Sequence, residues 1–209
     1  AEVGTLYKQE GKQKAFLRGL DIVGPKMSDF VRQAFRLASN NQLLLYCWRG
    51  GMRSGSMAWL FETSGLETAT LVGGYKAYRT YIRQAFLQAK HLVVLGGMTG
   101  SGKTEILHEL AKSGEQVLDL EGTAHHKGSS FGAIGQDAQP TSEEFENLLA
   151  HQWLQFDMDK TIWVEDESLR IGHVTQPETL YQHIRSAYVI KLELPFEVRV
   201  QRLVREYAS

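Results

Sequence analysis

The sequence has little of what marks a secreted or membrane-embedded protein. Its 209 residues include one cysteine, Cys47, which excludes an internal disulfide framework and a cysteine-rich zinc site. No apolar run reaches the roughly 18 residues of a membrane-spanning helix, and the polar start lacks the apolar core of a signal peptide. We therefore expect a cytoplasmic protein in a reducing environment, with no membrane partner.

The chain also lacks an excess of charge of either sign. It has 23 lysine and arginine residues against 24 aspartate and glutamate residues, which gives a formal net charge of −1. This balance gives no overall signal for nucleic-acid binding, although a local basic patch is compatible with it. With 43% hydrophobic residues, the chain is long enough to bury one large core or two small ones.

Apolar runs alternate with segments of helical periodicity along the chain. Predicted strands lie at residues 43–46, 69–72, 91–95, 116–120, 161–164 and 187–192. Predicted helices lie near residues 27–35, 54–63, 78–86, 106–111, 145–156 and 196–207. The run Leu43–Tyr46 reads as a fully buried strand. This alternation predicts the α/β class, with parallel sheets that helices cover on both sides.

Two glycine-rich turns between a strand and a helix indicate two such sheets. We place the boundary near Lys90, which gives a first domain over residues 1–89 and a second over residues 90–209. No strand pattern appears up to Leu20, and the chain stops within a predicted helix. We therefore expect the first domain to lack its N-terminal strands and the second to be incomplete at its C-terminal end.

The first glycine-rich turn begins at the only cysteine. Residues 48–54, which follow it, read Trp-Arg-Gly-Gly-Met-Arg-Ser and lead into an amphipathic helix. Backbone N–H groups of such a turn and of a helix start favour negative charge, and they lower the pKa of a thiol held there. The alternative is a buried, inert cysteine. The candidate catalytic residues of this loop are Cys47, Arg49, Gly50, Gly51 and Arg53.

The second turn fits the P-loop pattern G-x-x-x-x-G-K-[ST] in full, between a predicted strand and a predicted helix. Its glycines let backbone N–H groups approach phosphate oxygens, Lys103 supplies a cation, and the Thr104 hydroxyl is suited to hold Mg²⁺. The candidate phosphate-binding residues are Gly97, Thr99, Gly100, Ser101, Gly102, Lys103 and Thr104.

Acidic residues follow two of the later strands. Glu165, Asp166 and Glu167 come directly after one of them, where a P-loop domain needs an acid near its metal ion. We name Asp166, with Thr104, as the Mg²⁺ ligand, while all three acids stay open for a metal-side, substrate-side or solvated role. Asp119 and Glu121 end another strand, where kinases of similar fold often place a group that contacts the acceptor.

Two further polar segments have open roles. Arg199, Arg202 and Arg205 recur at helical spacing, which suits either a lid over phosphate or a solvated basic face. The segment 122–141 has no apolar period and is long for a structureless connection, so we expect it to be functional. Its stretch His125–Gly132 suits contacts to a nucleotide or RNA phosphate better than it suits a metal site.

The first half resembles a rhodanese domain. The stretch Cys47–Ser54 is similar to the active-site loop C-x-x-G-x-R-S with one residue more, and Leu71–Tyr78 is similar to the Gly-Gly-x-x-x-aromatic signature after the last rhodanese strand. In that family the loop cysteine carries a persulfide or selenide. The Asp-Val-Arg strand motif that opens most rhodaneses is absent here.

A rhodanese domain followed by a P-loop domain resembles the bacterial tRNA 2-selenouridine synthases. The match is carried by four stretches, Cys47–Ser54, Gly96–Thr104, His125–Gly132 and Val164–Ser168. The resemblance spans nearly the whole chain, and members of that family are longer at both ends. It implies a rhodanese-like parallel-sheet domain followed by a P-loop NTPase-like parallel-sheet domain.

The resemblance also implies a two-step modification of the tRNA wobble uridine. The sulfur of 2-thiouridine is first alkylated from geranyl diphosphate, which the P-loop and Mg²⁺ would hold. Selenium derived from selenophosphate, carried by Cys47, then displaces the S-geranyl group. The implied partners are tRNA, a small-molecule diphosphate and an enzyme that produces selenophosphate. Trp153, Phe156 and Trp163 are candidates, by composition, for an apolar pocket around the geranyl chain.

Two other function classes stay open. One is a P-loop kinase or NTPase with a rhodanese-like sulfur-transfer or scaffold domain, in which Cys47 is structural. The other is a tRNA-binding or partner-binding module without catalytic activity that uses both loops only to hold anions.

Overall fold

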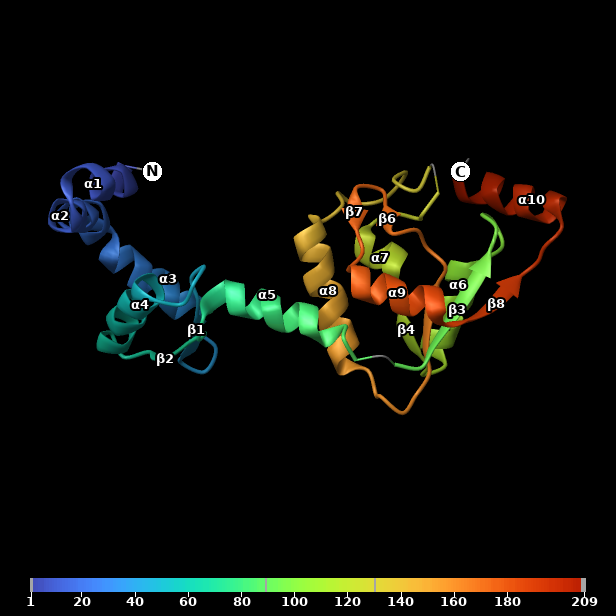
Figure 1. Cartoon of the computed structure of the whole chain (residues 1–209), viewed down its shortest axis with the longest axis horizontal. Helices are drawn as coiled ribbons and strands as arrows, with labels where there is room; N and C mark the ends of the chain where they lie inside the picture. Colours follow the sequence, from blue (N-terminus) through green and yellow to red (C-terminus); the bar gives the residue numbers. More distant parts are fainter. Residues whose placement is uncertain (1, 89, 130, 208–209) are drawn as a thin grey trace. The chain divides into compact units, whose positions relative to one another are not determined.

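The computed structural model describes residues 2–88, 90–129 and 131–207, and it divides into two compact units (Figure 1). The first unit comprises residues 1–78 and the second residues 79–209. Parallel strands and helices occur in both units, which confirms the predicted α/β class with parallel sheets. Within the described residues, no helix combines the length and the apolar character needed to cross a membrane.

Two parallel strands lie at the centre of the first unit, paired from Gln42 opposite Glu67 to Leu45 opposite Thr70. The helices predicted within residues 27–63 are present. The residues before them, which show no strand pattern, form two helices separated at Gly11. The elements are α1 (Glu2–Glu10), α2 (Lys12–Val23), a 3₁₀ turn (Gly24–Lys26), α3 (Met27–Leu37), β1 (Gln42–Leu45), α4 (Met52–Thr63) and β2 (Glu67–Thr70).

The prediction that Leu43–Tyr46 is a fully buried strand is wrong. Leu43 and Leu45 are half-buried against a small core around Phe61, whereas Leu44 and Tyr46 are 66% and 60% exposed. Within the described residues β1 pairs with β2 alone, and packing on one face leaves every second side chain outside. The next strand also lies earlier than predicted, at Glu67–Thr70, because it pairs in register with β1.

The second unit is built on a four-stranded parallel sheet of order β4-β5-β3-β8. Val94 and Leu95 on β3 point to opposite faces and are both buried, so elements cover both faces of the sheet there. Helices α6 and α9 both pack against β3. The elements are β3 (Leu92–Gly97), α6 (Lys103–Lys112), β4 (Gln116–Leu118), α7 (Leu120–Ala124), α8 (Ser142–Gln155), β5 (Ile162–Glu165), β6 (Arg170–Ile171), β7 (Val174–Thr175), α9 (Glu178–Ser186), β8 (Tyr188–Leu192) and α10 (Phe196–Tyr207).

The two units divide earlier than the boundary predicted at residues 89 and 90. Helix α5 (Gly74–Ala85) crosses the division at Tyr78, and Ala89 lies outside the described residues. The later turns of α5 belong to the second unit because their side chains are buried there. Phe86, directly after α5, is fully buried with its ring centroid 5.8 Å from that of Trp153.

Four short elements of the second unit were not predicted from the sequence, namely α7, β6, β7 and α9. The β6–β7 hairpin is too short to give a periodic pattern, and α9 shows a buried pair, Leu180 and Ile184, on a single turn. The strand predicted over residues 116–120 ends at Leu118 because Asp119 caps α7 instead. Its carboxylate accepts a hydrogen bond from the Gly122 N–H at 2.7 Å.

Helix α8 offers a matched test of the second core. Leu149 is fully buried, whereas its neighbour Leu148 is 43% exposed. We expect Leu149→Ala to lower the free energy of unfolding by about 2–5 kcal/mol, because a buried leucine leaves a cavity. Leu148→Ala should cost less than about 1 kcal/mol. Chemical denaturation followed by tryptophan fluorescence measures both, and equal losses would contradict this packing.

Candidate functional site

The Cys47 loop packs against the turn that starts α5, with backbone against backbone. The Cys47 carbonyl accepts a hydrogen bond from the Tyr75 N–H at 2.9 Å. Gly50 and Gly74 have φ of 58° and 62°, which favours glycine. A Cβ on Gly74 would lie 2.1 Å from the Cys47 carbonyl oxygen. The paired glycines of both motifs are therefore needed for this close approach.

The Cys47 thiol lies beside a buried hydroxyl. Its Sγ is 3.4 Å from the Ser54 Oγ, and that oxygen accepts a hydrogen bond from the Gly51 N–H at 3.3 Å. The hydroxyl of Ser54 and then its N–H lower the pKa of Cys47 to about 6, with the N–H groups of Arg49 and Gly51 adding to the effect. The lowered pKa agrees with the sequence-based expectation of a thiolate. Ser54, the residue that contributes most, had not been singled out within the motif.

The two arginines of this loop do not contribute to the lowered pKa through their charges. The side chains of Arg49 and Arg53 are exposed, and the lowered pKa of Cys47 has hydrogen bonds as its cause rather than these two charges.

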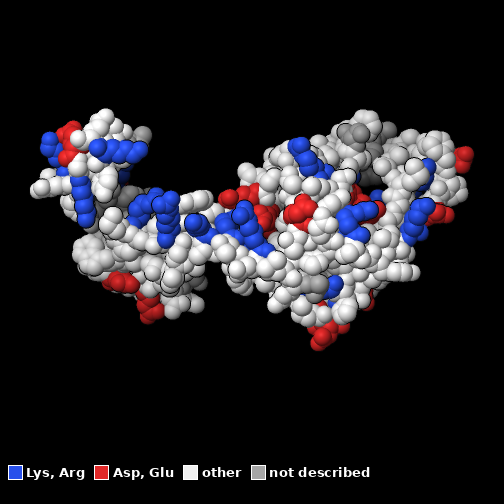
Figure 2. All heavy atoms as spheres, in the orientation of Figure 1, with Lys and Arg blue, Asp and Glu red and all other residues white. Residues whose placement is uncertain are grey.

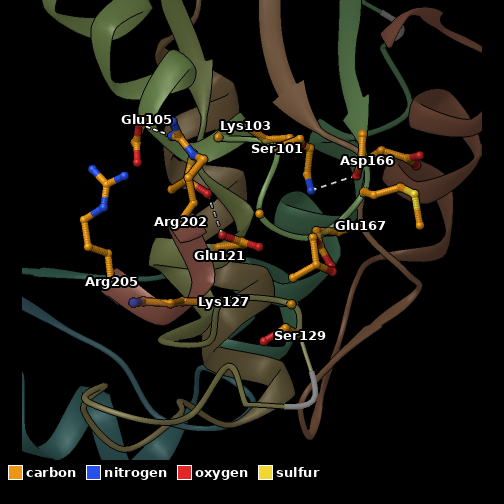
Figure 3. A pocket seen from close by; sticks show the side chains of 17 residues that line it. Ser101, Lys103, Glu105, Glu121, Lys127, Ser129, Asp166, Glu167, Arg202 and Arg205 are labelled. Carbon is orange, nitrogen blue, oxygen red and sulfur yellow. Dashed lines mark hydrogen bonds and ion pairs between the residues drawn. The ribbon is translucent and has the colours of Figure 1, made fainter. Parts of the chain in front are cut away.

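The P-loop connects β3 to α6 and lines a cavity of about 690 Å³ (Figure 3). Every phosphate-binding candidate from the sequence lies on this cavity, and so does Asp166. Glycine is again required, because a Cβ on Gly97 would lie 2.6 Å from the Ser101 Oγ and one on Gly100 would lie 2.8 Å from the Arg199 carbonyl oxygen. The lining residues are Gly97, Met98, Thr99, Gly100, Ser101, Gly102, Lys103, Thr104, Glu105, Glu121, Lys127, Gly128, Ser129, Asp166, Glu167, Arg202 and Arg205.

The two reactive side chains of the P-loop are held by neighbours. The Lys103 Nζ donates a hydrogen bond to the Gly97 carbonyl at 3.1 Å, which keeps the ammonium group over the loop. The Thr104 hydroxyl donates to a carboxylate oxygen of Glu121 at 2.9 Å. The nearest acid to Thr104 thus comes from α7, which follows β4. The sequence signal for it was only its place at the end of a strand.

The three consecutive acids after Val164 have distinct environments. Glu165 is buried and accepts a hydrogen bond from the Glu121 N–H at 2.7 Å, and burial raises its pKa to about 8. Asp166 lines the cavity and forms an ion pair with Arg185 at 2.8 Å. Glu167 also lines the cavity, and burial raises its pKa to about 7. Asp166 and Glu167 therefore line the cavity, whereas Glu165 does not.

Cations from two other segments reach the cavity. Arg202 and Arg205 of α10 line it, and Arg202 forms an ion pair with Glu105 at the start of α6. The Arg199 guanidinium donates to the Thr99 carbonyl at 3.2 Å. Of the two open roles for these arginines, the structure supports a place beside the phosphate loop. Lys127, from the long irregular segment, also lines the cavity.

The paired histidines lie outside the cavity lining. The His125 Nδ1 is 2.9 Å from the Ala138 carbonyl oxygen, and the His126 ring is packed against Gly132. The part of this stretch that reaches the cavity is Lys127–Ser129, while Ser130 lies outside the described residues. Across residues 2–88, 90–129 and 131–207, no group of three histidine, cysteine or acidic side chains is arranged to hold a metal ion.

The comparisons with known proteins agree on one family. The family model described as "tRNA 2-selenouridine synthase AAA domain" matches residues 90–209. The chain belongs to the tRNA 2-selenouridine synthase family.

Individual relatives carry the same name. The chain is 39% identical to "tRNA 2-selenouridine synthase" from Shewanella frigidimarina (strain NCIMB 400), with 100% of this chain and 57% of that protein covered. It is 41% identical to the protein of that name from Pseudomonas putida (strain GB-1), with 99% and 56% covered. The chain thus spans somewhat more than half the length of these curated relatives.

One solved structure is also similar in sequence. It is the "Crystal structure of N-terminal domain of putative ATP/GTP binding protein from Clostridium difficile 630". The identity is 48%, with 39% of this chain and 64% of that chain covered, at a TM-score of 0.36.

The aromatic residues chosen by composition for a geranyl pocket in this family member are placed elsewhere. Trp153 is fully buried in the core, and the indole N–H of Trp163 donates to Glu115 at 3.3 Å. Neither these two nor Phe156 lines the P-loop cavity. The apolar side chain that does is Met98, which is 64% exposed. Trp153 is taken up by the core, as large aromatics often are, whereas Phe156 and Trp163 are half-buried away from the cavity.

The Cys47 loop predicts a measurable titration. Alkylation of Cys47 should follow its thiolate, so the rate should rise with pH through a pKa of about 6. Ser54→Ala should move this midpoint upward, toward the roughly 8.5 of a free cysteine. Ser56→Ala, an exposed serine on the same helix, should leave it unchanged. A wild-type midpoint near that of free cysteine would contradict the geometry.

The P-loop predicts anion binding through Lys103. We expect Lys103→Ala to weaken the binding of inorganic diphosphate by about tenfold or more, since a charged hydrogen bond is lost. Lys112, at the end of the same helix, is exposed and paired with Glu109, so Lys112→Ala should bind as the wild type does. Isothermal titration calorimetry in the presence of Mg²⁺ compares the three proteins.

Proposed function

We propose that this chain converts 2-thiouridine at the tRNA wobble position into 2-selenouridine. The observation that carries the proposal is the presence, in one member of this family, of a cysteine of lowered pKa in a glycine turn and of a P-loop cavity lined by cations. A phosphate loop alone fits many enzymes. The thiolate adds a nucleophile that a simple nucleotide hydrolase does not need.

In the first step, the P-loop cavity would hold geranyl diphosphate. The thiouridine sulfur forms a bond to the first carbon of the geranyl chain, the carbon–oxygen bond to diphosphate breaks, and the base loses a proton. Lys103 and the P-loop N–H groups would stabilise the charge on the departing diphosphate. Arg202 adds a further cation on the cavity.

We propose Mg²⁺ as the metal ion of this cavity, held by a few oxygen donors of the protein together with the substrate phosphates. Thr104 and Asp166 are the ligands we propose, with Glu121 and Glu167 as neighbouring carboxylates. Mg²⁺ commonly binds through one or two carboxylates together with substrate phosphates. When bound, it supplies positive charge to the diphosphate.

In the second step, the Cys47 loop would deliver selenium. Overall, S-geranyl-2-thiouridine, selenophosphate and water give 2-selenouridine, geranyl thiol and phosphate. The Cys47 thiolate would form a bond to the phosphorus of selenophosphate as the phosphorus–selenium bond breaks, and water would later release phosphate from the cysteine. The hydrogen selenide set free displaces geranyl thiolate from the base, and the thiolate takes a proton. Gly50, Gly51 and Arg53 would shape the anion site around these groups. This role corresponds to a rhodanese-like identity for the first domain, over residues 1–89, ahead of a P-loop NTPase-like domain over 90–209. An enzyme that produces selenophosphate would be its supplier, in the cytoplasm.

Two variants separate the steps. Cys47→Ser should abolish selenium incorporation and leave geranylation intact, whereas Lys103→Ala should abolish geranylation. Mass spectrometry of a 2-thiouridine anticodon stem–loop incubated with geranyl diphosphate, Mg²⁺ and then selenophosphate measures both products. Lys112→Ala serves as the control with both activities.

Other outcomes would favour another function. Equal loss of both products in Cys47→Ser would contradict the division of labour. Rapid ATP hydrolysis that does not respond to geranyl diphosphate would instead support a P-loop kinase or NTPase with a rhodanese-like scaffold.

A further inference from the structure

Four aromatic rings form a continuous group next to the reactive thiol. This aromatic cluster consists of Tyr46, Trp48, Tyr75 and Tyr78. The ring of Tyr75 lies at its centre, with centroid distances of 6.0 Å to Tyr46, 5.7 Å to Trp48 and 5.8 Å to Tyr78. Tyr46 is 60% exposed and Trp48 is 52% exposed, although residues of this size usually bury most of their surface.

The cluster is fixed to the Cys47 loop by its backbone. Tyr46 and Trp48 flank Cys47 in the sequence, and the Tyr75 N–H donates to the Cys47 carbonyl at 2.9 Å. The Lys76 N–H donates to the Trp48 carbonyl at 3.0 Å. The rings are thus positioned by the same contacts that shape the thiol site. Core packing does not account for the two rings that are exposed.

The two segments that carry the cluster contain basic residues and no acidic ones. Segments 46–54 and 71–78 contain three basic residues, Arg49, Arg53 and Lys76, and no aspartate or glutamate. All three side chains are exposed. On the face of the first unit that Figure 2 shows, the acidic side chains gather near α1 and near β2, and basic side chains lie between them. Exposed rings with adjacent cations complement flat bases joined by phosphates.

We propose that the aromatic cluster is a stacking platform for unpaired bases of an RNA loop, with Arg49, Arg53 and Lys76 on the adjoining phosphates. This inference rests on the proposed function, in which the target base lies in the single-stranded anticodon loop. A base stacked on Trp48 brings its neighbour in the strand to Cys47. A purely apolar occupant would not use the exposed guanidinium groups of Arg49 and Arg53.

Binding of a fluorescently labelled anticodon stem–loop to the full 209-residue chain tests the platform without any cosubstrate. We expect Trp48→Ala and Tyr46→Ala each to raise the Kd by about tenfold, a typical loss for one stacked base. Trp48→Phe keeps an aromatic face and should stay within about threefold of the wild type. Trp59→Ala removes a tryptophan that is 62% exposed on α4 of the same unit but outside the cluster, and it should bind as the wild type does.

Each other outcome has a defined meaning. An unchanged Kd in Trp48→Ala and Tyr46→Ala, or an equal loss in Trp59→Ala, would overturn the platform. Weaker binding of geranyl diphosphate with unchanged RNA binding would assign the cluster to the prenyl chain instead. Normal Cys47 alkylation in each variant shows that the loop is folded.

The same assay separates this inference from the proposed function. A wild-type chain that binds the loop through the cluster but transfers neither geranyl nor selenium would contradict the proposed function alone. A chain that modifies the RNA equally well with and without Trp48 would contradict the platform alone.

Discussion

Backbone lies against backbone at both glycine-rich loops, with no room for a side chain between the two strands of chain. A Cβ at Gly50 would lie 2.5 Å from the Gly74 nitrogen, and one at Gly100 would lie 2.8 Å from the Arg199 carbonyl oxygen. The close packing of both loops therefore depends on glycine at these positions. The P-loop cavity and the hydrogen bonds that lower the pKa of Cys47, chief among them that of the Ser54 hydroxyl, belong to these closely packed turns.

The parallel sheet of the second unit gathers charge from distant parts of the chain. The P-loop follows β3, the acids 165–167 follow β5, and the arginines of α10 follow β8. Because parallel strands end at the same edge, all these segments meet on one cavity. Of the acids on this cavity, Glu167 has a pKa that burial raises to about 7, so it carries less negative charge at neutral pH than an exposed glutamate does.

Local patterns were predicted well from the sequence, and tertiary partners were not. The P-loop motif, its flanking elements and the lowered pKa of Cys47 depend on neighbours within a few residues. The exposure of side chains on β1 depends on how many strands and helices cover it, and the periodicity of the sequence does not reveal that number. Glu121 reaches Thr104 through the fold, and Ser54 contributes more to the Cys47 pKa than the arginines beside it. Side-chain partners of this kind are decided by packing in three dimensions.

The hydrogen bond from the Lys103 ammonium to the Gly97 carbonyl has a further consequence. The lysine is already held over the loop by a neutral acceptor, so an arriving phosphate does not have to recruit a freely moving side chain. When phosphate binds, the lysine exchanges the neutral Gly97 carbonyl oxygen for a charged phosphate oxygen. The side chain loses little conformational entropy in that exchange. For the diphosphate that we propose as its ligand, the loop would thus be preorganised, with its own carbonyl oxygen in place of a phosphate oxygen.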